Sequence, residues 1–251
     1  MTKNMKTIDE FKNKIILGDC LEVMSELPDK SIDMILCDLP YGVTARNEWD
    51  SIIPLTELWM NYHRVIKGNG AIVLTSIQPF TSVLVTNNLK DFKYEWVWRK
   101  QQGTGFLNAK KQPLRNHESI LVFYQKQPTY NPQFMAGKPY KCLSGKGSLD
   151  NNKQIRVVTE NLGIRYPLTV LDFAYDKNKT HPTQKPVALF EYLIKTYTNE
   201  GEDIVLDNCI GSGTTAIACI STNRNYIGIE KEEKYVEIAN KRINEVKNKL
   251  I

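Results

Sequence analysis

Residues 38–41 read Asp-Leu-Pro-Tyr and directly follow an apolar run at 34–37. The carboxylate of Asp38 and the main-chain carbonyl of Leu39 could accept both N–H bonds of an exocyclic nucleobase amine, and so turn its lone pair towards an incoming methyl group. Pro40 fixes the backbone just after that carbonyl, and Tyr41 offers a face on which an extruded base can stack. The segment therefore suggests methylation of an amine, with an ordinary strand-to-turn segment as the alternative.

A second group of residues lies at 204–230. A short strand at 204–206 leads into Asp-Asn-Cys-Ile-Gly-Ser-Gly-Thr-Thr, a helix of small residues, another strand and Glu230. Gly211 and Gly213 let the backbone approach a ligand, and the helix N-terminus presents unpaired N–H groups. An acid at the end of the second strand can bind both hydroxyls of a ribose. The pattern indicates an adenosine-containing ligand; because a third glycine is missing, a dinucleotide is less favoured. A glycine turn that only joins strand to helix is the alternative.

The hydrophobic pattern predicts the scaffold that must position both groups. Alternating strands and helices favour a parallel α/β sheet, with strands expected at 14–17, 32–37, 71–75, 204–206 and 226–229 and helices at 20–27, 55–66, 187–197, 216–220 and from about 232. Two aromatic-rich strands, 92–98 and 119–124, flank a basic loop that contains glycines. From 127 to 180 the periodicity is lost, which predicts an inserted irregular lobe.

Composition is that of an ordinary globular chain, with 251 residues, 41% of them hydrophobic and 24% charged. We expect no membrane span, no secretory signal and a cytoplasmic location. The five cysteines form neither a CxxC pair nor a metal-like cluster, so we assign no metal site. We interpret them as small apolar residues in a reducing compartment.

The net charge of +5 is unevenly distributed along the chain. Residues 93–115 and 126–181 each carry a balance of +5, whereas residues 1–92 and 191–251 carry −3 and −2. This segregation suits a protein with one side facing a polyanion. Solvated lysine-rich loops would give the same balance, so charge alone does not decide between the two.

Together these residues resemble the DNA amino-methyltransferases, which use S-adenosylmethionine (SAM) and act on adenine N6 or cytosine N4. The acceptor motif of that family is Asp, Asn or Ser, then two prolines and an aromatic residue; its cofactor motif is commonly D-P-F-x-G-S-G-T. Residues 38–41 and 207–214 match these motifs, with Leu39, Asn208 and Cys209 as departures. Residues 181–186, His-Pro-Thr-Gln-Lys-Pro, are a further family signature.

The order of these motifs resembles the permuted β group of the family. This resemblance implies a Rossmann-like methyltransferase fold with a mostly parallel, circularly permuted sheet and helices on both faces. It divides the chain into a catalytic half at 1–126, an inserted target-recognition lobe at 127–180 and a cofactor-binding half at 181–251.

The resemblance also implies roles for individual residues. The catalytic group would be Asp38, Leu39, Pro40 and Tyr41. The cofactor would contact Asp19, Asp38, Thr183, Lys185, Asp207, Cys209, Gly211, Ser212, Gly213, Thr214 and Glu230. Among these, Asp19 would reach the adenine amine of the cofactor, Glu230 its ribose, and Thr183 with Lys185 its carboxylate. DNA would contact Arg99, Lys100, Phe106, Lys110, Lys111 and Arg115.

The leading hypothesis is a DNA adenine N6-methyltransferase that flips its target base and transfers the methyl group directly. Asp at the first motif position usually accompanies adenine in this family, whereas Ser usually accompanies cytosine N4. Cytosine N4 is therefore the main alternative, followed by RNA or a protein amide as the acceptor and by a non-catalytic nucleic-acid-binding module. Double-stranded DNA is the expected partner, and a second copy of the chain and a cognate restriction endonuclease are candidate partners. For Trp96 and Trp98 we favour the core over base stacking.

Overall fold

The structure is a computed structural model and describes residues 6–42, 52–144, 157–176 and 184–250. The chain divides into two compact units. The first unit comprises residues 1–131 and 169–251, and the second is Pro132–Leu168. None of the described helices combines the length and the apolar character needed to span a membrane.

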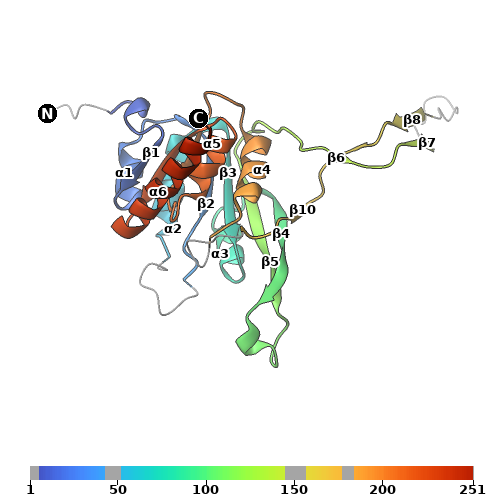
Figure 1. Cartoon of the computed structure of the whole chain (residues 1–251), viewed down its shortest axis with the longest axis horizontal. Coiled ribbons are helices and arrows are strands. Elements are labelled where there is room, and N and C mark those ends of the chain that lie inside the picture. Colours follow the sequence, from blue (N-terminus) through green and yellow to red (C-terminus); the bar gives the residue numbers. More distant parts are fainter. Residues whose placement is uncertain (1–5, 43–51, 145–156, 177–183, 251) are drawn as a thin grey trace. The chain divides into compact units, whose positions relative to one another are not determined.

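A twisted sheet forms the centre of the first unit (Figure 1). Its strands in the described residues are β1 (Lys14–Leu17), β2 (Ile32–Asp38), β3 (Ile66–Ser76), β4 (Phe92–Thr104), β5 (Arg115–Phe123), β10 (Val170–Asp172), β11 (Ile204–Asp207) and β12 (Asn225–Glu230). Their order across the sheet is β1-β12-β11-β2-β3-β5-β4-β10. Strand β5 is antiparallel to both neighbours, and the other adjacent strands pair in parallel. The predicted mostly parallel α/β sheet is confirmed.

Helices cover both faces of this sheet. Helices α1 (Cys20–Glu26), α2 (Leu55–Val65) and α3 (Phe80–Asn87) pack on one face, and α4 (Val187–Tyr197), α5 (Thr214–Ser221) and α6 (Glu233–Leu250) pack on the other. The strands read as continuous apolar runs because alternate residues enter the two cores. In β2, Ile35 and Cys37 face the first core, while Met34 and Leu36 face the second.

Polar residues gather where the parallel strands end. Asp38 closes β2, Asp207 closes β11 and Glu230 closes β12, and these strands run in the same direction. The carboxyl ends of such strands are where open α/β sheets bind ligands. The sheet therefore brings the two predicted groups, far apart in the sequence, to one edge.

The strands on the far side of the sheet differ from the sequence prediction. Strand β3 begins at Ile66 rather than at the predicted residue 71, because β2 pairs with both ends of this strand across an irregular register. The predicted loop after residue 98 is largely a hairpin, in which Arg99 pairs with His117 and Thr104 with Arg115. Cross-strand pairing thus gives structure to polar residues that show no hydrophobic period.

The second unit, Pro132–Leu168, contains two short antiparallel ladders. Strand β6 (Met135–Ala136) pairs with β9 (Ile164–Arg165), and β7 (Tyr140–Ser144) pairs with β8 (Val157–Asn161). The segment predicted to be irregular therefore has regular pairing in its described residues. The unit also contains fewer residues than the predicted lobe at 127–180, because β10 pairs with β4 in the main sheet.

Candidate active site

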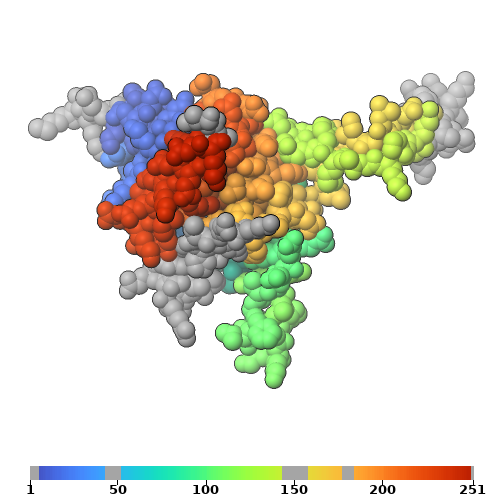
Figure 2. All heavy atoms as spheres, viewed as in Figure 1, coloured from blue at the N-terminus to red at the C-terminus, as the bar shows by residue number. Residues whose placement is uncertain are grey.

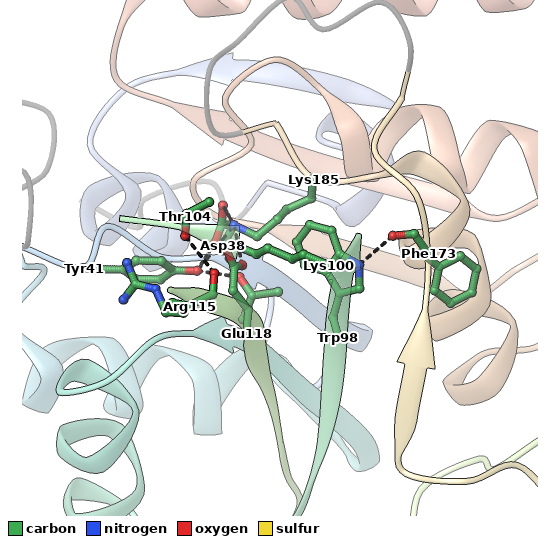
Figure 3. Close-up of polar contacts among 10 residues, drawn as sticks. Asp38, Tyr41, Trp98, Lys100, Thr104, Arg115, Glu118, Phe173 and Lys185 are labelled. Atoms are coloured by element: carbon green, nitrogen blue, oxygen red, sulfur yellow. Dashed lines mark hydrogen bonds and ion pairs between the residues drawn. The ribbon is translucent and has the colours of Figure 1, made fainter. Parts of the chain in front are cut away.

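Asp38 lies at the end of β2 and is held by three donors (Figure 3). The hydroxyls of Tyr41 and Thr75 both donate to its Oδ1. The Lys185 ammonium lies 2.5 Å from its Oδ2. Burial, with the Asp38 charge beside it, raises the pKa of the Tyr41 phenol well above its ordinary value, so this hydroxyl remains a neutral donor. The carboxylate predicted to accept an amine is thus partly buried and oriented by three hydrogen-bond donors.

Lys185 comes to this carboxylate from the segment just before α4. Its side chain is 6% exposed. Burial opposes its charged form, but the carboxylates of Asp38 and Glu118 outweigh that effect and hold the pKa of Lys185 well above its ordinary value. The sequence resemblance assigned this ammonium to the carboxylate of the cofactor; here its contact is Asp38.

The turn after β11 forms the second half of the site. Gly211 and Gly213 have φ values of +50° and +85°, a region that favours glycine. A Cβ on Gly213 would lie 3.0 Å from the Cβ of Ala239 in α6, so α6 packs directly on the turn. Arg242 of the same helix donates to the carbonyl of Ser212 at 2.5 Å and to its Oγ at 2.9 Å. The turn is therefore fixed from outside the cavity.

Glu230 joins this turn to the end of β12. Its Oε2 accepts from Gly211 N at 2.9 Å, and its Oε1 accepts from Glu232 N at 3.0 Å. Burial raises the pKa of Glu230 above its ordinary value. Because the carboxylate is held at both oxygens, it presents a fixed acceptor pair at the position where a ribose is bound in such folds.

Asp207 supports the turn from inside. Its Oδ2 accepts from the Thr215 hydroxyl, and its Oδ1 accepts from Cys209 N at 3.1 Å. Burial raises the pKa of Asp207 to about 6. The bond from Thr215 ties the first residue of the turn to α5, and the bond from Cys209 N holds the turn itself.

The two residues that depart from the family's cofactor motif, Asn208 and Cys209, pack against the first core. Asn208 is buried and accepts a hydrogen bond of 2.5 Å from the Tyr62 hydroxyl of α2. Cys209 lies against the thiols of Cys20 and Cys37. Hydrogen bonding to Cys209 and burial raise the pKa of Cys20, and burial raises the pKa of Cys37 to about 12. These thiols stay protonated at neutral pH and pack as small side chains.

A cavity of about 500 Å³ connects the acceptor segment to the turn. Predicted residues that line it are Asp19, Asp38, Leu39, Pro40, Tyr41, Lys100, Arg115, Lys185, Asp207, Cys209, Gly211, Ser212, Thr214 and Glu230. Asp19 also caps α1, accepting from Leu21 N at 2.8 Å. Thr183 lies outside the described residues. The structure therefore places both predicted groups around one space.

The residues predicted to contact DNA divide into three sets. Phe106, Lys110, Lys111 and Arg115 are exposed on the hairpin formed by β4 and β5, and this hairpin projects from the rest of the first unit (Figure 2). Arg99 is exposed, but its guanidinium forms two hydrogen bonds of 2.6 Å with Asp172. Lys100 is 6% exposed and pairs with Glu118 inside the cavity, so its ammonium does not lie on the outer surface of the hairpin. Trp96 and Trp98 are buried in the core, as we favoured.

Sequence reasoning missed Thr75 and Glu118. Thr75 is the cross-strand neighbour of Asp38 on β3, and it follows an apolar run just as Asp38 does. Glu118 comes between a basic segment and the apolar end of β5. A polar residue at the end of a predicted buried strand was the available signal for Thr75. The signal for Glu118 was a single acid beside many basic residues.

These residues fit a nucleoside cofactor that carries a positive charge. The cavity has the size of a small-molecule site. It offers a doubly held acid at the end of β12, the N-terminus of α5 and a turn that only glycines allow. The fold and the site together are typical of an α/β enzyme that binds a nucleoside cofactor at the carboxyl ends of its strands.

Comparison with known proteins identifies the family. The sequence profile of the DNA methylases of the N6/N4 family matches residues 32–241. Type II methyltransferase M.HinfI of Haemophilus influenzae is 30% identical over 96% of this chain and 71% of its own length. Type II methyltransferase M.HpaI of Haemophilus parainfluenzae is 30% identical over 92% of this chain and 74% of its own.

Solved structures agree with these sequence matches. The crystal structure of an M1.HpyAVI–SAM complex is 27% identical, with a TM-score of 0.61 over 91% of this chain and 98% of that one. The cytosine-N4-specific PvuII DNA methyltransferase is 14% identical, with a TM-score of 0.67 over 94% of this chain and 91% of that one, and it shows the fold alone. The chain belongs to the SAM-dependent DNA methylases of the N6/N4 family.

Proposed function

We propose that this protein methylates the N6 amine of adenine in double-stranded DNA after the base has been flipped out of the helix. The observation that carries the proposal is the position of Asp38, whose oriented carboxylate faces the same cavity as the glycine turn and Glu230. Adenine is favoured because an acid at this first motif position usually accompanies adenine in the family that the chain resembles.

The cofactor would be held by residues on both sides of the turn. Glu230 would accept from the ribose hydroxyls, and the backbone of 211–214 would surround the methionine portion. When bound, SAM supplies an electrophilic methyl group on its sulfonium. Asp19, Asp207 and Glu230, which line the cavity, would offset the positive charge of the cofactor.

Asp38 and the Leu39 carbonyl would orient the amine. Each would accept one N–H of the adenine amine, so the nitrogen lone pair points into the cavity towards the cofactor side. Tyr41, whose ring is 5.7 Å from that of Phe80, would stack on the base. The methylated nitrogen then returns to neutrality by releasing a proton, for which Asp38 is the adjacent acceptor.

The hairpin between β4 and β5 would contact the duplex beside the target base. Phe106 is 80% exposed and Leu107 is 98% exposed at its tip, with Lys110 and Lys111 just beyond. Basic side chains next to an apolar tip suit phosphate contacts around an inserted wedge. The Type II names of the relatives make a cognate restriction endonuclease a candidate partner.

The product identifies the base. Purified protein is incubated with isotopically labelled SAM and unmethylated genomic DNA, and the digested nucleosides are separated by mass spectrometry. We expect labelled N6-methyl-2′-deoxyadenosine. Label only in N4-methylcytosine would overturn the adenine assignment, and label in RNA or protein but not in DNA would overturn the choice of substrate. Heat-denatured DNA in parallel reactions tests the preference for a duplex.

A further inference from the structure

Glu118 is a buried acid in the active-site cavity to which the family motifs assign no role. It lies on β5 and is 8% exposed. Its Oε1 pairs with the Lys100 ammonium, but no described residue donates a hydrogen bond to its buried Oε2. Burial of a carboxylate oxygen without a hydrogen-bond donor costs free energy, so a nearby cation that could pair with it is of interest.

Lys185 is the nearest cation to that oxygen. Its Nζ lies 3.4 Å from Glu118 Oε2 and 2.5 Å from Asp38 Oδ2, so the ammonium lies between two carboxylates (Figure 3). A charge-assisted hydrogen bond closes at about 2.8 Å. A movement of less than about 1 Å would therefore bring the ammonium to hydrogen-bonding distance from Glu118 and could lengthen its contact with Asp38.

Such a transfer would free an oxygen of Asp38 for a substrate amine. Both donors to its Oδ1, Tyr41 and Thr75, are neutral hydroxyls fixed by strand β3 and the acceptor turn. Lys185 occupies its Oδ2 and is the one donor of the three with a second carboxylate beside it. The oxygen that Lys185 covers is therefore the one most readily given to a substrate.

We propose that Glu118 is a positioning residue that takes the Lys185 ammonium from Asp38 when the target amine binds. The four groups alternate in sign, in the order Lys100, Glu118, Lys185 and Asp38. Two ammonium groups balance two carboxylates, so the shift needs no ion from solvent. This inference rests on the proposed role of Asp38 as the amine acceptor.

Lys100 holds one carboxylate oxygen of Glu118 in place. Its ammonium pairs with Glu118 and lies 5.4 Å from the centroid of the Trp98 ring. The indole N–H of Trp98 donates to the Phe173 carbonyl at 2.9 Å, which fixes that ring. Glu118 is thus held at one oxygen and open at the other, as the acceptor of a mobile ammonium must be.

The test compares Glu118→Gln with wild-type protein in a filter assay that counts labelled methyl groups on DNA. The amide keeps the shape of the side chain but lacks the charge that attracts Lys185. We expect kcat to fall about 10- to 100-fold, the range set by one hydrogen bond to a charged group. The dissociation constant for SAM, measured by calorimetry, should stay within about twofold of wild type. Glu95→Gln, an exposed change of the same kind on β4, should match wild type in both measurements.

A double-mutant cycle decides whether Glu118 acts through Lys185. In a Lys185→Met background, adding Glu118→Gln should lower kcat by less than about threefold. Glu118→Asp, which keeps the charge, should recover part of the lost rate.

Several results would overturn the inference: an unchanged kcat in Glu118→Gln, equal losses in both backgrounds, or a Glu118→Gln protein that no longer unfolds cooperatively or binds SAM. The assay counts methyl groups on either base, so an N4-methylcytosine product would overturn the adenine proposal alone. If wild-type protein transfers no methyl group to DNA, that result would overturn the proposed function itself.

Discussion

Asp38 is the residue on which the proposed chemistry depends most directly. In Asp38→Asn, the amide would present an N–H where the amine needs an acceptor, and it would leave the Lys185 ammonium without its carboxylate partner. We expect kcat to fall about 100- to 1000-fold, as when one oriented polar group of an active site is removed. The affinity for SAM, measured by calorimetry, should change little. Asp33→Asn on the same strand is the matched control, because Asp33 pairs with Lys67 outside the cavity. Equal losses in the two variants would contradict a role specific to Asp38.

The raised pKa of Asp207 predicts how the free energy of unfolding depends on pH. Its carboxyl group titrates near 3.8 in the unfolded chain and, because of burial, near about 6 in the folded protein. Between these values the folded state binds more protons, so the free energy of unfolding falls as pH rises from 4 to 6 and this contribution is constant above. Relative to Asp207→Asn, wild type should gain about 2–3 kcal/mol between pH 7 and pH 4, measured by urea unfolding. A stability difference that does not change with pH would contradict the buried, ionised state of Asp207.

At the scale of elements, the turn between β11 and α5 depends on Gly213. Alanine there would adopt a left-handed φ of +85° and place its Cβ 3.0 Å from Ala239 of α6. Gly213→Ala should lower the free energy of unfolding by about 1–3 kcal/mol and weaken SAM binding. Gly201→Ala is the control, since φ is +95° there but no atom lies within 4 Å of the added Cβ. It should carry the backbone cost alone and bind SAM as wild type does. Equal effects on SAM binding would show that packing on α6 does not shape the site.

The proposed phosphate contacts of the hairpin between β4 and β5 predict how DNA affinity depends on salt concentration. Lys110 and Lys111 lie near its exposed tip, where the proposal has them contact phosphates. Replacing both with Gln should reduce the slope of log K against log salt concentration by about 0.9 for each lost contact. The comparison is Lys90→Gln with Lys93→Gln at the other end of β4, which should leave the slope unchanged. For both double variants, DNA affinity is measured across salt concentrations by fluorescence anisotropy. An unchanged slope in the tip variant would show that Lys110 and Lys111 do not contact phosphates.

The elements near the site could be predicted because their signals are local. Strands β1 and β2 and helix α1 follow from buried apolar runs and from turn residues at their ends. The extension of β4 and β5 could not be predicted, because pairing between Thr104 and Arg115 depends on a distant partner and the residues are polar. Helix α3 was missed for a related reason: its sequence is rich in Val and Thr, which favour strands.

The same division applies to the site. The residues at the ends of β2, β11 and β12 were predicted, because a motif and a strand end coincide there. The network of Lys100, Glu118 and Lys185 was not, because its members come from β4, β5 and the segment before α4. Lys100 in particular was assigned to DNA from its basic neighbours, whereas strand alternation turns its side chain inward.

At the scale of the whole molecule, the acidic and the basic segments of the chain carry different proposed binding sites. The segments 1–92 and 191–251, which carry Asp38, the cofactor turn and Glu230, are mildly acidic. The positive segments, 93–115 and 126–181, contain the exposed hairpin and the second unit. This distribution fits an enzyme that binds a cationic cofactor in one region and a polyanion with others.

The most direct test of the account is modification-sensitive sequencing of genomic DNA from cells that lack adenine methylation and express this protein. We expect N6-methyladenine within a defined sequence in cells with wild-type protein, and none in cells that express Asp38→Ala at an equal level. Methylation that persists in the Asp38→Ala cells, or genomic DNA without methylated amines in the wild-type cells, would contradict it.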